Sequence, residues 1–152
     1  MEYQVVGDLD FNYTVFYQGK EFIKIIQKSV WLIGNRSRFY IGGALILETV
    51  TYSLFLWQKM EIQRFDQERK FDLFRNGLNY GLRNNEGEFT LSLAPFRKTV
   101  GKLYLNMEQI GEVKVTKAIS VDPRVFDIYF YQENANYYFA ILLFIMHLQI
   151  GV

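Results

Sequence analysis

YYFAILLFIMHLQIGV, residues 137–152, is the stretch that decides the fold, because it contains no charged residue. It is apolar on every side, and a helix of this kind is either wrapped by protein or placed in lipid. At 1.5 Å per residue the segment 137–150 spans about 21 Å, less than the ~30 Å hydrocarbon core of a membrane. No basic cluster follows to anchor it at a far interface. We therefore predict a buried core helix over 137–150, with a membrane anchor and a central strand pair as the alternatives.

Most of the remaining chain alternates apolar and polar residues at period two, which indicates half-buried strands. Turn signals at Gln18-Gly19, Gly34-Asn35, Asn76-Gly77, the 84–87 cluster and Asp122-Pro123 separate the runs. The pattern predicts about ten to twelve short antiparallel strands. The clearest apolar faces are Tyr13, Val15 and Tyr17; Ile23 and Ile25; Phe89, Leu91 and Leu93; Leu103 and Leu105; Val113 and Val115; and Phe126, Ile128 and Phe130.

The stretch from Phe39 to Trp57 carries one charge, Glu48. Gly42-Gly43 and the β-branched residues argue against a spanning helix, so we predict two strands, 38–41 and 45–58, the second with a bend. Glu48 is expected to point outward or to mark a bulge. Residues 63–70 are compatible with a short helix or with an exposed loop.

These elements predict a mainly β protein in which a closed antiparallel barrel of about twelve strands surrounds a C-terminal hydrophobic α-helix. A barrel of that width cannot be filled by its own side chains and must hold a ligand, water or a plug. The apolar helix is a suitable plug, because each inward face gains about 25 cal/mol per Å² buried against it. We expect one domain, 1–152, since this length suits a single core.

The order of the last elements in the chain resembles that of a known protein family. The hairpin GKLYLNMEQIGEVKVTK, the strand VFDIYFYQ and the final apolar helix resemble the tubby C-terminal-like superfamily. That group includes tubby domains, LURP-one-related proteins, phospholipid scramblases and small bacterial relatives. The resemblance implies a twelve-stranded barrel around a C-terminal helix. It also implies binding of anionic phospholipid through basic residues, although no basic motif here matches the family position by position.

Composition excludes several classes of function. The net charge of +1 argues against general binding of nucleic acid, and the absence of cysteine excludes thiol catalysis and thiolate metal sites. The single histidine, His147, lies in the apolar helix and is expected to be a locally hydrogen-bonded core residue. No metal site, cofactor motif or phosphate-binding loop is found. The first ten residues lack the features of a signal peptide, so a cytoplasmic location is expected, with peripheral contact to a membrane.

Two sets of basic residues are the candidate lipid-binding site. The lysines of the predicted strand after Gly19 alternate with the inward isoleucines and form an outward row, while the other set lies in the second half of the chain. Their alternative role is a solvated strand face that discourages edge pairing. The candidates are Lys20, Lys24, Lys28, Arg97, Lys98, Lys102 and Lys114.

The leading functional prediction is a non-enzymatic module that binds anionic membrane lipid or a protein partner, with its oligomeric state left open. A second prediction is a lipocalin-like carrier of a hydrophobic small molecule, which requires an empty lumen. A third is an enzyme that works through paired carboxylates across an open pocket.

Overall fold

A computed structural model describes residues 1–30, 34–54, 57–77, 79–93, 99–117 and 124–150. Within them lie twelve strands, two 3₁₀ turns and one α-helix. The strands are β1 (Glu2–Gly7), β2 (Tyr13–Tyr17), β3 (Lys20–Val30), β4 (Gly34–Ile41), β5 (Ala44–Leu54), β6 (Trp57–Phe65), β7 (Asp72–Asn76), β8 (Asn79–Asn84), β9 (Gly87–Leu93), β10 (Thr99–Leu105), β11 (Glu108–Lys117) and β12 (Arg124–Phe130). The turns are η1 (Gln67–Arg69) and η2 (Ala135–Tyr137), and the helix is α1 (Tyr138–Gln149).

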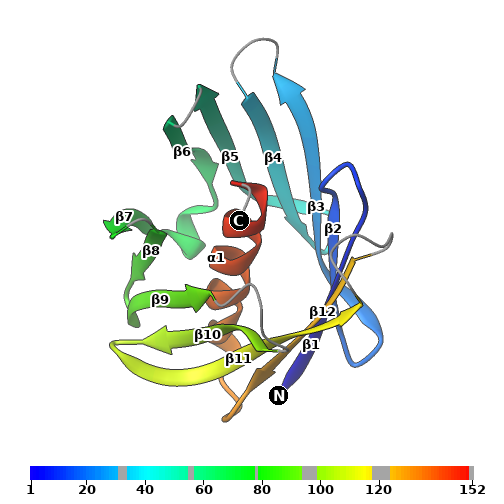
Figure 1. Ribbon diagram of the computed structural model, residues 1–152, viewed down its shortest axis with the longest axis vertical. Coiled ribbons are helices and arrows are strands. Elements are labelled where there is room, and N and C mark those ends of the chain that lie inside the picture. The colour runs from blue at the N-terminus through cyan, green and yellow to red at the C-terminus, as the bar shows by residue number, and fades with distance from the viewer. Residues whose placement is uncertain (31–33, 55–56, 78, 94–98, 118–123, 151–152) are drawn as a thin grey trace.

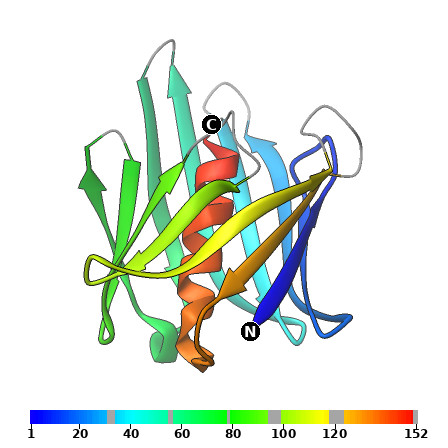
Figure 2. The ribbon, with the colours of Figure 1, turned by 60° about the horizontal axis from the view of Figure 1, so that its bottom comes forward.

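All twelve strands form one antiparallel sheet in the order β6-β5-β4-β3-β2-β1-β12-β11-β10-β9-β8-β7. The sheet curls into a nearly closed barrel, and β1 joins the last strand, β12, with an unbroken register from Glu2–Tyr129 to Gly7–Arg124. Helix α1 runs through the interior (Figures 1 and 2). The predicted barrel around a C-terminal helix is confirmed.

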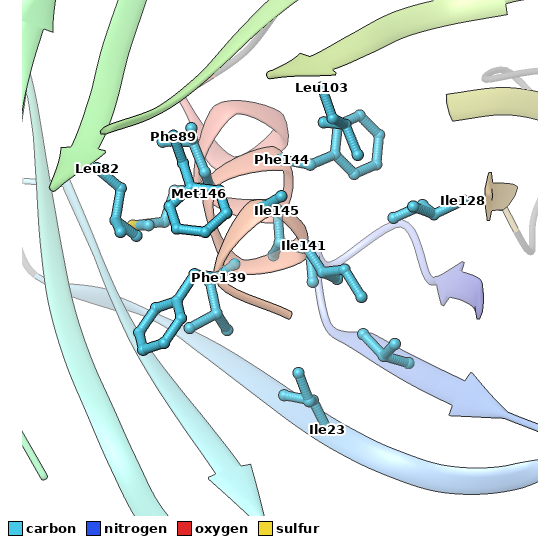
Figure 3. Close-up of a cluster of buried hydrophobic side chains, with 14 of the residues drawn as sticks. Ile23, Leu82, Phe89, Leu103, Ile128, Phe139, Ile141, Phe144, Ile145 and Met146 are labelled. Atoms are coloured by element: carbon cyan, nitrogen blue, oxygen red, sulfur yellow. The ribbon is translucent and has the colours of Figure 1, made fainter. Parts of the chain in front are cut away.

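Helix α1 is buried from Phe139 to His147. Side chains from strands on several sides of the barrel point at it, including Ile23, Leu82 and Ile128 (Figure 3). The turn η2 precedes the helix, and the Asn134 side chain caps it by accepting the Asn136 N–H at 2.9 Å. Among the described residues, no helix combines the length and apolar character needed to span a membrane.

Two predicted strand boundaries are wrong. The predicted strand 45–58 is two strands, because β5 ends at Leu54 and β6 begins at Trp57 and pairs back along it. The apolar character continues across this break, so periodicity did not reveal it. Strand β4 begins at Gly34, four residues earlier than predicted, and Arg36 therefore lies within the sheet. The predicted turn at Gly34-Asn35 is wrong, because both residues pair with the end of β3. The segment 63–70 is the end of β6 followed by the turn η1.

The barrel has a seam where the edge strands β6 and β7 face each other without strand pairing. Side chains cross it instead. Arg75 donates to the Gln58 carbonyl at 3.0 Å, and the Met60 N–H donates to the Tyr80 hydroxyl at 3.1 Å. The Arg75 guanidinium also lies over the Tyr80 ring, 4.3 Å from its centroid. Among the described residues, Arg75 of β7 and Tyr80 of β8 therefore provide side-chain hydrogen bonds across the seam.

Candidate functional site

A basic groove on the outer face of β3 and β4 is the strongest candidate site. Lys28 and Arg36 are direct cross-strand partners, and Arg38 lies two residues further along β4. Cross-strand partners lie about 5 Å apart at Cβ, so the strand pairing itself holds like charges together. The groove has a volume of about 300 Å³, and every charged side chain among its described lining is cationic. We define the basic groove by its lining residues Ile26, Lys28, Ser29, Val30, Arg36, Arg38 and Tyr40.

Glu48 partly offsets this charge from the neighbouring strand β5. Its carboxylate accepts from Arg38 Nε at 2.7 Å and lies 3.8 Å from Arg36 Nε. The pair with Glu48 raises the pKa of Arg38, which keeps the guanidinium charged. Glu48 points outward, and the β5–β6 register shifts beside it, as predicted for this residue. One carboxylate beside three cations leaves the groove with an excess of positive charge.

The structure divides the predicted lysine row. Lys24 and Lys28 share the outer face of β3, and Lys24 is the cross-strand partner of Tyr40. The β2–β3 register slips between Val15 and Phe16 and leaves Phe22 as an extra residue packed against the core. The alternation restarts at this bulge, so Lys20 is out of phase with the other two. The continuous row of three lysines is therefore wrong at its first member.

The second predicted set lies elsewhere and faces carboxylates. Lys102 on β10 is the cross-strand partner of Glu112. Lys114 on β11 is opposite Asp127, and its Nζ lies 3.1 Å from Glu112. These lysines are exposed but neutralised, and the structure does not bring them to the basic groove. Arg97 and Lys98 lie outside the described residues.

Sequence reasoning missed Arg36 and Arg38, which complete the groove. They alternate with the buried Ser37 and Phe39 at period two, a signal for an outward pair in a strand. The strand was expected to start at Arg38, and a hairpin between β3 and β4 was not predicted. Pairing those two strands would have placed Arg36 beside Lys28.

His147 is a buried structural residue, as predicted. It is 2% exposed, and its Nε2 accepts the Tyr80 backbone N–H at 3.1 Å. Its Nδ1 therefore carries the proton that is donated to the Leu143 carbonyl at 2.8 Å. Burial lowers the pKa of His147, which keeps the ring neutral. Neither ring nitrogen is directed at a carboxylate, and the described residues contain no cluster of three or more histidines and acids able to hold a metal.

The lumen is occupied by protein. Helix α1 fills it with apolar side chains, and Phe144 contacts Phe126 edge to face at 5.3 Å between centroids. A lipocalin-like carrier needs that space for its ligand. The carrier prediction therefore has no support from the described interior.

Three carboxylates do share a larger open groove, of about 750 Å³, on the outer face near β1, β2 and β12: Glu2, Asp127 and Glu133. A carboxylic acid that donates a proton at neutral pH is usually desolvated. Here Glu2 and Glu133 are exposed, and Asp127 accepts from Thr116 at 2.5 Å and from Gln4 at 3.4 Å. The arrangement offers negative charge but lacks a buried acid.

The fold and this surface define a class: a twelve-stranded antiparallel barrel that wraps a C-terminal helix and carries a cationic groove on its outside. Comparison with protein-family models, with curated proteins and with solved structures found no match for this chain. The resemblance to the tubby-like superfamily therefore stays a prediction.

Proposed function

We propose that this chain is a non-enzymatic, tubby-like barrel that binds the anionic surface of a membrane through the basic groove. The observation that carries the proposal is the cross-strand pair Lys28–Arg36 with Arg38 alongside. Strand pairing fixes these cations on a rigid surface, and phosphate is the group that closely spaced guanidinium and ammonium groups bind best. In this proposal the protein is cytoplasmic and peripheral to the membrane.

The free energy of membrane binding can be estimated from the number of basic residues. A basic residue close to an anionic membrane contributes about 1 kcal/mol, which corresponds to about a fivefold change in partitioning. Three such residues, offset by Glu48, give weak binding that depends strongly on salt. The barrel therefore needs high local lipid charge to remain bound.

Vesicle sedimentation at low salt tests the proposal. The wild-type chain should pellet with phosphatidylglycerol-containing vesicles and remain in the supernatant with pure phosphatidylcholine. The variant Lys28→Ala/Arg36→Ala should bind about thirtyfold more weakly, because two residues each lose about 1 kcal/mol. The matched control Lys102→Ala/Lys114→Ala removes the same charge from the neutralised set and should bind like the wild type.

Two results would contradict the proposal. Equal recovery of the wild type in the supernatant with both lipids would exclude a membrane role for the basic groove. Equal losses in the two double variants would show that net charge, rather than the basic groove, controls binding.

A further inference from the structure

A second surface of the molecule has the opposite character. On the outside of the barrel, Tyr129 of β12 lies in one cross-strand row with Glu2 of β1 on one side and Glu112 of β11 on the other. Tyr129 is 44% exposed and Tyr131 is 48% exposed, and their rings contact each other at 5.9 Å between centroids. We define the tyrosine face as Glu2, Glu112, Lys114, Asp127, Tyr129, Tyr131 and Glu133, in which Lys114 lies opposite Asp127 and beside Glu112.

Exposed aromatic pairs of this kind are characteristic of binding surfaces, because tyrosine offers a large contact area with little conformational entropy to lose. Gln109 donates to the Tyr131 hydroxyl at 2.7 Å and helps to fix that ring. Burial, and next the nearby Glu112, raise the pKa of Tyr131, so its ring remains neutral at physiological pH. A neutral, electron-rich ring between carboxylates suits a guanidinium group.

The two surfaces carry opposite net charge. The four carboxylates of the tyrosine face outnumber the lysines beside them, Lys102 and Lys114, which are the cross-strand partners of Glu112 and Asp127. The face therefore keeps an excess of negative charge, whereas the charged lining of the basic groove is Lys28, Arg36 and Arg38. Each surface also carries tyrosine, with Tyr40 in the basic groove. Because β3–β4 and β11–β12 are separated by β2 and β1 in the sheet order, the two surfaces face different directions. One molecule therefore cannot bring them together, but two molecules can.

We infer that the partner of the tyrosine face is a second copy of this chain, which docks its basic groove there in a head-to-tail contact. Arg36 or Arg38 would lie against the Tyr129 ring, and Lys28 would lie among the carboxylates. A contact between two different patches leaves one of each patch free, so further copies can add. The inference goes beyond the proposed membrane function but uses the same basic groove.

Sedimentation velocity of the wild type is the first test. At about 10 mM salt the Debye length is about 30 Å, and at about 1 M it is about 3 Å. The sedimentation coefficient should rise with protein concentration at low salt and should be that of a monomer at high salt. A monomer at every concentration and salt would overturn the inference, and so would association that high salt leaves unchanged.

Two double variants test which surfaces meet. The groove variant Lys28→Ala/Arg36→Ala and the face variant Glu2→Gln/Glu112→Gln should each be monomeric alone. Mixed in equal amounts, each supplies the surface that the other lacks, so they should form a complex that stops at two copies. All four substituted side chains lie on the outer face, and circular dichroism should show the wild-type spectrum.

A mixture that remains monomeric, or variants that associate like the wild type, would contradict the head-to-tail contact. Vesicle binding separates this inference from the proposed function. The face variant should lose association while still pelleting with phosphatidylglycerol vesicles, because its basic groove is unchanged. Failure of the wild type to bind vesicles, with the mixing result as expected, would refute the membrane role alone.

Discussion

At the scale of single residues, His147 connects the inside of the barrel to its seam. Its ring accepts the Tyr80 N–H, and the hydroxyl of the same tyrosine accepts the Met60 N–H from β6. Strand β8 pairs with β9 only from Leu82 to Asn84, so Tyr80 lies beyond the end of that ladder. The histidine therefore supplies the acceptor that a neighbouring strand would otherwise provide. An unpaired buried N–H costs about 1–3 kcal/mol, which explains a polar side chain in an apolar helix.

This contact predicts a pH dependence of stability. Burial places the pKa of His147 in the folded protein below its ordinary value of 6.5. The unfolded chain therefore binds the proton first as the pH falls, and the free energy of unfolding should decrease from about pH 6.5 downward until the folded pKa is reached. Urea unfolding at about pH 8 and about pH 5 measures the loss, with His147→Gln as the comparison because glutamine keeps an acceptor without titrating. The same acid-induced loss in the variant would assign the effect to other groups.

At the scale of elements, the seam between β6 and β7 is the least redundant part of the barrel. Other neighbouring strands share ladders of backbone hydrogen bonds, whereas among the described residues β6 is bonded across the seam by the side chains of Arg75 on β7 and Tyr80 on β8. The neighbouring Met60 is 4% exposed. Loss of the tyrosine oxygen would consequently leave a buried donor unpaired on an edge strand.

Replacing Tyr80 by phenylalanine tests this dependence. We expect the free energy of unfolding to fall by about 1–3 kcal/mol, because the Met60 N–H loses its acceptor. Hydrogen exchange should also accelerate first along β6, since local opening starts where closure is weakest. Tyr104→Phe, on β10 away from the seam, is the control and should change neither measurement. Uniform acceleration across all strands would show that the seam opens only with the whole barrel.

The elements also show what the sequence could predict. The helix was predictable because a stretch without charge and too short for a membrane has to be buried, and the strands around Ile23, Phe89 and Ile128 were predictable from alternation. The break between Leu54 and Trp57 was not, since apolar residues continue through it. The basic groove depends on Lys28 and Arg36 being partners. Predicting that register requires predicting the hairpin, so the lysine pattern alone identified one of the three cations of the groove, Lys28.

At the scale of the whole molecule, a net charge of +1 conceals a separation of charge. Cations are in excess on β3 and β4, whereas around Tyr129 on β1, β11 and β12 the carboxylates outnumber the neighbouring Lys102 and Lys114. A molecule with this separation has an orientation in an electric field even when its total charge is small. When the basic groove binds an anionic membrane, the tyrosine face would point away from that membrane. Lipid and a second copy of the chain are thus competitors for one groove.

Competition predicts that anionic vesicles dissociate the head-to-tail assembly. The chain contains no cysteine, and Met107 at the β10–β11 turn is 93% exposed, so Met107→Cys gives one labelling position outside both surfaces. Energy transfer between donor- and acceptor-labelled copies should be present at low salt. It should fall when a large excess of phosphatidylglycerol vesicles is added, because lipid phosphates occupy the basic groove and the excess keeps bound copies apart. Phosphatidylcholine vesicles are the control and should leave the transfer unchanged. Energy transfer that stays constant while the protein pellets with anionic vesicles would mean that lipid and the second copy bind different surfaces. One of the two proposed roles of the basic groove would then be wrong.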